Sequence, residues 1–270
     1  MKLCSPFARH DELVAGLLTE LIDRQRAEGL IDRWFYIRYA DPALHLRVRL
    51  RATNDAAAGQ VLQATLAWCR DQVGAGLASS SAVDAYRPEI DRYGGPLVFD
   101  DVEAFFTANS DVTAAPVALL RTEKELSAEF VAVTAVDALY QQFGLDLNER
   151  LRLAPPGDDS ARARQVHREH RSYLGELLVP WAQRPDERGL AHRTLLAPLL
   201  ERQTETAARA ALAMDAVHAR GLMIGGRAGI LGSLVHMQIN RLMAVDLGRE
   251  SRCYALWRNV LRAVRGRPVG

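Results

Sequence analysis

Three short segments of the sequence carry residue types that could bind an anion or move a proton. The first is HLRVRLR at 45–51, in which basic and apolar residues alternate strictly. Neighbouring side chains of a β-strand point to opposite faces, so the basic set would share one face and the apolar set would face the core. The basic set is His45, Arg47, Arg49 and Arg51, and the apolar set is Leu46, Val48 and Leu50. Because arginine matches a carboxylate, this face predicts a carboxylate- or peptide-binding surface; the alternative is a solvated edge strand whose charges oppose aggregation.

The second segment is YRPEIDRYGG at 86–95. Pro88 favours an extended backbone at the residue before it, and the Gly94-Gly95 pair permits a tight change of direction. In a turn, Glu89 and Arg92 could pair, and Glu89 could also orient an arginine of the first segment. The alternative is an ion pair that only supports the structure.

The third segment is SLVHMQINR at 233–241. In a helix Ser233, His236 and Asn240 would form one stripe, because they are three and four residues apart. Histidine takes or gives a proton near neutral pH, so His236 is the candidate acid–base residue. The alternative is a hydrogen-bonded histidine of the core.

A further pair of histidines, His167 and His170, has a spacing that could share a metal ion. Arginines surround both residues in the sequence, and no cysteine or aspartate partner is arranged beside them, so we predict a solvated helix face and no metal site. The sequence also has no P-loop, no dinucleotide-binding fingerprint and no GxSxG elbow. We therefore expect no cofactor.

The elements that must position these segments follow from hydrophobic periodicity and from turn residues. We predict a helix over 11–30, strands over 34–40 and 45–51, a helix over 54–73 and an extended segment over 81–90. Further helices are expected over 99–109, 112–143, 158–178, 187–219, 230–246 and 249–265, with breaks at 155–157 and 180–185. The predicted fold class is α+β, with a small antiparallel sheet near the N-terminus packed against a large helical section, and residues 1–270 forming one module.

Composition limits the class of protein. Hydrophobic residues make up 49% and charged residues 25% of the 270 residues, which is typical of a globular chain with a substantial core. The formal net charge of +1 argues against nucleic acid as a direct partner. No apolar run is long enough for a signal peptide or a membrane span, and the three cysteines are scattered. We therefore predict a cytoplasmic protein without a membrane partner, and leave open whether it is a monomer or a homodimer.

Taken together and in order, WFYIRYADPALHLRVRLR, YRPEIDRYGG and SLVHMQINRL resemble the C-terminal elimination domain of class I lanthipeptide dehydratases and its free-standing thiopeptide relatives. The resemblance covers residues 10 to 265. It implies an enzyme that acts on a modified, leader-bearing precursor peptide. Members of the family either remove glutamate from glutamylated Ser or Thr, giving dehydroalanine or dehydrobutyrine, or join two dehydroalanines by a formal aza-[4+2] cycloaddition that expels water and the leader.

The resemblance also implies roles for individual residues. Arg47 and Arg49 match strand arginines that face the glutamyl adduct, and Glu89 with Arg92 matches an acid and an arginine of the family's turn. His236 and Arg241 match a histidine and an arginine of its late helix, and Asn240 and Arg241 are expected to bind the substrate. In an eliminase, His236 would be the acid or base and the arginines would hold the leaving carboxylate. In a pyridine synthase, Ser233, His236 and Glu89 would assist tautomerisation and loss of water, while Tyr86 and Tyr93 shape the pocket.

Three functions follow from this resemblance. Because the sequence lacks the large domain that uses glutamyl-tRNA in full-length dehydratases, we expect a stand-alone module, and its length favours a pyridine synthase. We therefore predict a pyridine synthase. The complete set of arginines, glutamate and histidine favours the alternative, a glutamate eliminase. The third hypothesis is a silent subunit that binds a leader peptide as an extra strand at the sheet edge near 34–51. Each enzyme hypothesis requires the predicted site residues to converge on one pocket.

Overall fold

The computed structural model describes residues 1–157, 161–179, 186–243 and 246–266. A four-stranded antiparallel sheet forms the N-terminal part, with strand order β2-β3-β1-β4. The predicted strands are confirmed as β2 (Ile31–Tyr39) and β3 (His45–Ala52). The sequence did not reveal β1 (Lys2–Cys4), which is too short to show an alternating pattern. Of the predicted extended segment 81–90, only the start belongs to a strand, β4 (Ser80–Ala82).

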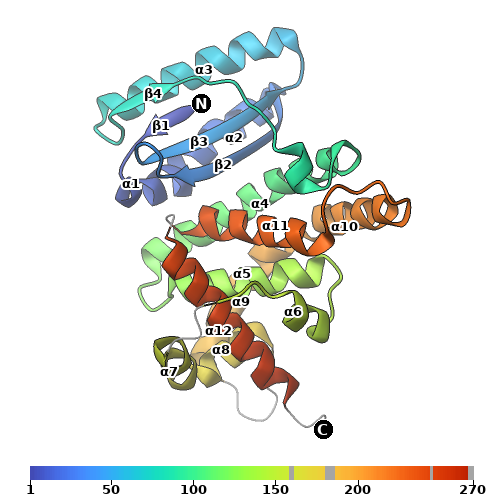
Figure 1. Cartoon of the computed structure of the whole chain (residues 1–270). Coiled ribbons are helices and arrows are strands. Elements are labelled where there is room, and N and C mark those ends of the chain that lie inside the picture. Colours follow the sequence, from blue (N-terminus) through green and yellow to red (C-terminus); the bar gives the residue numbers. More distant parts are fainter. Residues whose placement is uncertain (158–160, 180–185, 244–245, 267–270) are drawn as a thin grey trace.

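Two long helical segments pack on one face of this sheet (Figure 1). The first contains α1 (Phe7–Glu12), a π-helical stretch (Leu13–Leu17) and α2 (Leu18–Ala27). The second is α3 (Asp55–Gly74), whose N-terminus is capped by the Asn54 side chain. Leu46 and Val48 of β3 are buried, as the alternation predicted.

The opposite side of the sheet adjoins the helical section, which follows in the order α4 (Pro96–Thr122), α5 (Ala128–Gln142), α6 (Leu147–Leu153), α7 (Ala161–Glu169), α8 (Arg171–Leu178), α9 (Glu187–Glu201), α10 (Thr204–Ala219), α11 (Arg227–Leu242) and α12 (Leu247–Arg265). The predicted α+β class is therefore correct. Within the described residues, no helix combines the length and the apolar content that crossing a bilayer requires.

Several predicted helix boundaries were wrong. The break expected at 110–111 does not exist, because the hydroxyls of Ser110 and Thr113 donate to backbone oxygens one turn earlier and are accommodated inside α4. The chain instead leaves the helix at 123–127. The short helix α6 was not predicted; a capping box of Asp146 and Glu149 starts it.

The remaining helices also differ from the predicted ranges. The stretch 187–219 is two helices, separated at Arg202 and Gln203. In the described part of 158–178, α7 and α8 are separated at His170. The predicted break at 155–157 is confirmed as non-helical. The break expected at 180–185 lies outside the described residues.

Side chains from two helices cover the outer edge of β2. Asn240 of α11 accepts a hydrogen bond from the backbone N–H of Arg38 and donates to its carbonyl oxygen, both at 2.8 Å. Arg241 Nε donates to the carbonyl of Tyr36 at 3.0 Å, and Ser110 of α4 accepts from the N–H of the same residue at 3.4 Å. These bonds replace a neighbouring strand. The expectation that a leader peptide adds as a strand at 34–51 is therefore wrong, since the β2 edge is occupied and β3 lies inside the sheet.

A buried histidine predicts how stability depends on pH. His10 of α1 is fully buried, and its Nε2 lies 2.9 Å from the carbonyl oxygen of Ser5. Burial, followed by the nearby charge of Arg38, lowers the pKa of His10 to about 4. Between pH 6.5 and 4 the unfolded chain therefore binds a proton that the folded chain does not. The free energy of unfolding should decrease as the pH is lowered through this window, by up to about 3 kcal/mol.

Urea unfolding at pH 7 and pH 4.5 tests this. The variant His10→Gln keeps a donor for Ser5 but cannot titrate, so it should lose less stability between the two pH values than the wild type. Equal losses in the two proteins would contradict a contribution from His10.

Candidate active site

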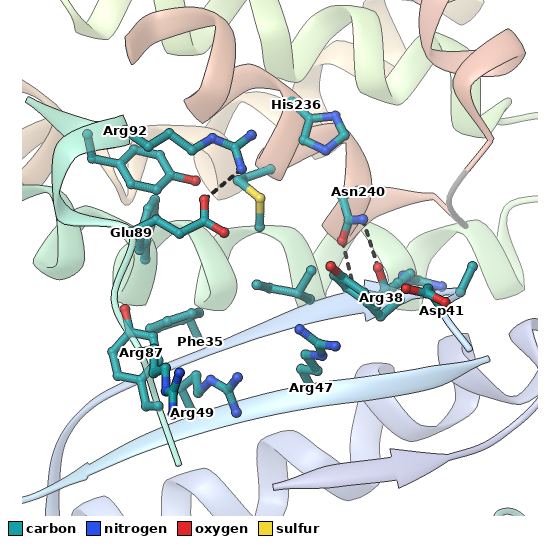
Figure 2. A pocket seen from close by; sticks show the side chains of 17 residues that line it. Phe35, Arg38, Asp41, Arg47, Arg49, Arg87, Glu89, Arg92, His236 and Asn240 are labelled. Carbon is teal, nitrogen blue, oxygen red and sulfur yellow. Dashed lines mark hydrogen bonds and ion pairs between the residues drawn. The ribbon is translucent and has the colours of Figure 1, made fainter. Parts of the chain in front are cut away.

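A cavity of about 420 Å³ lies where the sheet meets the helical section. Its walls come from β2, β3, the segment 86–93 and α11, together with one aromatic residue of α4. The structure brings eight of the ten predicted site residues to this cavity, which are Arg47, Arg49, Tyr86, Glu89, Arg92, Tyr93, His236 and Asn240. Figure 2 labels six of these residues around the cavity, on segments far apart in the sequence, which are Arg47, Arg49, Glu89, Arg92, His236 and Asn240. Ser233 and Arg241 do not line it.

Strand β3 presents Arg47 to the cavity in a fixed orientation. Ile37 of β2 lies opposite Arg47 in the sheet register, so the two side chains share this face. Arg47 Nε donates to Nε2 of His45 at 3.0 Å, and its guanidinium lies 3.6 Å from the centre of the Tyr39 ring. Burial lowers the pKa of His45, whose Nδ1 contacts the carbonyl oxygen of Ala43 at 2.7 Å. His45 is thus a neutral acceptor that holds Arg47 in place.

Arg49 is the least satisfied of the strand arginines. Its Nη1 is buried and has no hydrogen-bond partner among the described residues, and its guanidinium lies 5.3 Å from the centre of the Tyr86 ring. Burial, followed by the charge of Arg47, lowers the pKa of Arg49. An anion in the cavity would offset both the cost of burying this charge and its repulsion from Arg47.

Arg51, two residues further along β3, has a different environment. It forms a salt bridge with Asp32 at 2.6 Å and lies 3.5 Å from Asp100. Arg51 does not line the cavity. The alternative of an edge strand is wrong, because β3 lies inside the sheet. Arg51 alone has the solvated, acid-paired environment that this alternative implied, whereas Arg47 and Arg49 fit the interpretation as an anion-binding face.

The segment 86–95 places a paired acid and arginine at the cavity. The turn Ile90–Tyr93 is a single 3₁₀ helix, and Gly94 and Gly95 follow it with φ of +100° and +93°, which favours glycine. This turn brings Glu89 within 2.7 Å of Arg92. Arg92 Nε also donates to Oγ of Ser233 on α11 at 3.2 Å, so Ser233 helps to fix the position of the Arg92 side chain.

His236 of α11 faces the cavity and is held by a residue outside the three segments. Its Nδ1 lies 2.9 Å from both carboxylate oxygens of Glu250 in α12, and Glu250 also accepts a hydrogen bond from the hydroxyl of Tyr254. A carboxylate only accepts, so Nδ1 carries a proton and the neutral ring keeps its lone pair on Nε2. Sequence reasoning missed Glu250 because it lies 14 residues away, on another helix, with no local pattern that points to it.

Asn240 and Arg241 mainly join the sheet to the helices. Asn240 lines the cavity while it bonds to the backbone of Arg38. Arg241 is fully buried and donates to Tyr36 and to Oδ1 of Asn109, the latter at 2.6 Å. Burial lowers the pKa of Arg241 to about 10. Its contacts are those of a residue that positions the cavity walls.

The two predicted tyrosines form walls of the cavity. Tyr86 packs edge-on against Phe35, and Tyr93 packs edge-on against Phe106. Burial raises the pKa of both hydroxyls, and for Tyr86 the neighbouring Glu103 raises it further. Both therefore remain neutral near pH 7. Arg87 also lines the cavity, although the sequence analysis gave it no role.

The chain matches the family model for the C-terminal part of lantibiotic biosynthesis dehydratases over residues 1–261. It is 24% identical over 266 residues to the subtilin biosynthesis protein SpaB of Bacillus subtilis, covering 98% of this chain and 25% of SpaB. It is 23% identical over 268 residues to the epidermin biosynthesis protein EpiB of Staphylococcus epidermidis, covering 96% of this chain and 25% of EpiB. The chain thus spans about a quarter of the length of these curated relatives.

Two crystal structures share the fold. The tRNA-dependent lantibiotic dehydratase MibB from Microbispora sp. 107891 aligns with a TM-score of 0.79 and 23% identity, over 100% of this chain and 28% of MibB. TsrL aligns with a TM-score of 0.52 and 13% identity, over 100% of this chain and 98% of TsrL. Since the family model covers nearly the whole chain, this protein belongs to the lantibiotic dehydratase C-terminal family.

Proposed function

We propose that this chain removes glutamate from glutamylated serine or threonine side chains of a leader-bearing precursor peptide. The observation that carries the proposal is the pair Arg47 and Arg49, which form no salt bridge in the described part of the chain and share a cavity with His236 (Figure 2). A leaving carboxylate needs a cationic site, and the proton removed with it needs a base. The family assignment supports the same chemistry.

The proposed step balances without a cofactor. His236 Nε2 takes the proton from Cα of the glutamylated residue, and the electron pair of the Cα–H bond forms the Cα=Cβ double bond. The Cβ–O bond breaks and its electron pair leaves on the carboxylate of glutamate. The products are the dehydrated peptide, glutamate and a proton that passes from His236 to solvent.

The arginines stabilise charge at two places in this step. Arg47 and Arg49 would bind the departing carboxylate, which carries a full negative charge only after the Cβ–O bond breaks. Arg92, which Glu89 and Ser233 hold at 2.7 and 3.2 Å, would face the amide oxygen on which negative charge develops when the Cα proton is removed. Preorganised donors favour the transition state more than the bound substrate.

The variant Arg49→Met should eliminate glutamate roughly 10- to 100-fold more slowly than the wild type, because a charge-assisted hydrogen bond to the leaving group is lost. Arg51→Met on the same strand is the matched control and should stay within about threefold, since Arg51 lies outside the cavity. Rates are measured by mass spectrometry of a glutamylated peptide. Equal rates in the two variants would contradict the role of Arg49.

The second candidate is the pyridine synthase activity expected from the sequence. The apolar part of the cavity favours it, because Phe35, Ile37 and Met237 could hold two dehydroalanines side by side. Glu89 and His236, which line the cavity, would then move the protons of tautomerisation and water loss, while Ser233 acts only through Arg92. This candidate ranks second because its reaction releases no carboxylate that Arg47 and Arg49 could bind.

Mass spectrometry of two peptides separates these functions. One peptide carries glutamylated serines, and the other carries a leader and two dehydroalanines in an azole-containing core. Loss of glutamate from the first supports the proposed eliminase. Loss of leader and water from the second, with a new pyridine absorbance, supports the synthase instead. Binding of both peptides without change would favour the silent peptide-binding subunit.

A further inference from the structure

The cavity residue His236 is attached to a buried carboxylate that belongs to none of the three segments. Glu250 lies in the first turn of α12, and its side chain is only 13% exposed, against 33% for His236. Both carboxylate oxygens are 2.9 Å from His236 Nδ1. The Tyr254 hydroxyl, one turn further along α12, donates to the same carboxylate.

The contacts define the hydrogen-bonding role of Glu250. Burial, followed by the hydrogen bond to Glu250, raises the pKa of Tyr254, so this hydroxyl stays protonated and donates. The first turn of a helix also favours a negative charge. With donors on two sides, the Glu250 carboxylate acts as a hydrogen-bond acceptor.

As an acceptor, Glu250 restricts His236 in two ways. It fixes the proton of the neutral ring on Nδ1, which leaves Nε2 as the only nitrogen able to accept a proton. It also prevents rotation of the ring, which would otherwise exchange the two nitrogens. When Nε2 takes up a proton, the carboxylate at 2.9 Å stabilises the imidazolium.

We propose that Glu250 is a positioning residue for His236, that it sets the Nδ1–H tautomer and stabilises the protonated ring, and that Tyr254 in turn fixes Glu250. The catalytic part of this proposal rests on the proposed eliminase function. The tautomer and orientation of the ring do not rest on that function, because they follow from the contacts of α11 and α12 alone.

The first measurement is the tautomer of His236 in the full chain, read from the ring nitrogen shifts of ¹⁵N-histidine-labelled protein. The signal is assigned among the seven histidines by its absence from His236→Gln. The neutral wild-type ring should carry its proton on Nδ1. A wild-type ring protonated on Nε2 would overturn the proposal, whether or not the protein eliminates glutamate.

The second measurement compares kcat and KM of elimination. Glu250→Gln keeps the shape of the side chain but removes its charge, and should lower kcat roughly 10- to 100-fold with KM nearly unchanged. Tyr254→Phe keeps the ring and removes the donor, and should lower kcat by a smaller factor. The control Glu205→Gln, at an exposed position of α10, should match the wild type.

The two proposals fail in distinguishable ways. A wild type that eliminates glutamate and a folded Glu250→Gln with the same kcat would overturn the positioning role and leave the eliminase function intact. A wild type without elimination would overturn the function, while the tautomer measurement still decides the role of Glu250. If Glu250→Gln does not fold, Tyr254→Phe decides: an unchanged kcat and tautomer population overturn the proposal, and a decrease in both supports it.

Discussion

The variant His236→Gln should eliminate glutamate roughly 10²- to 10⁴-fold more slowly than the wild type, with peptide affinity close to that of the wild type. Glutamine has a similar length and can still donate to Glu250, so the contact between α11 and α12 at this position can be retained. It cannot accept a proton at neutral pH, and positioned acid–base residues contribute factors of this size. The effect should therefore appear in kcat rather than in KM.

Single-turnover assays on a glutamylated peptide measure this directly. The matched control is His218→Gln, which changes an exposed histidine of α10 and should leave the rate unchanged. Peptide affinity is measured separately, by fluorescence anisotropy of the same peptide. A His236→Gln enzyme within threefold of the wild-type rate would show that another group removes the proton.

The largest loss of stability is expected for Arg241→Met. Arg241 is fully buried and donates to the carbonyl oxygen of Tyr36 and to Oδ1 of Asn109. Methionine fills part of the volume but leaves both acceptors buried without a donor, at about 1–3 kcal/mol each. The free energy of unfolding should therefore fall by about 2–6 kcal/mol, because these bonds join β2 to α4 and α11.

Denaturant unfolding with a conserved m-value measures this loss. Arg262→Met is the matched control, since Arg262 is exposed in α12 and should change stability by less than about 0.5 kcal/mol. If Arg241→Met were as stable as the wild type but had lost elimination activity, Arg241 would act on the substrate, as the family resemblance implied, and not through the fold.

Local patterns in the sequence determined much of the secondary structure and most of the candidate site residues. Strict alternation in 45–51 was sufficient to separate the buried Leu46 and Val48 from Arg47 and Arg49, because the two-residue period of a strand is a property of the backbone itself. The helical spacing of 233–241 and the glycines after 86–93 likewise predicted their local structures. The three segments together identified the family, and eight of the ten residues taken from them line one cavity.

Only the tertiary structure decided which of these residues act together. Arg49 and Arg51 look the same in the sequence, but β3 carries one into the cavity and the other to Asp32. Asn240 and Arg241 were expected to bind substrate, yet they hold the backbone of β2 more than 200 residues away. Glu250 was not found at all. Contacts of this kind depend on how helices pack in three dimensions, and a single sequence has no periodicity that encodes them.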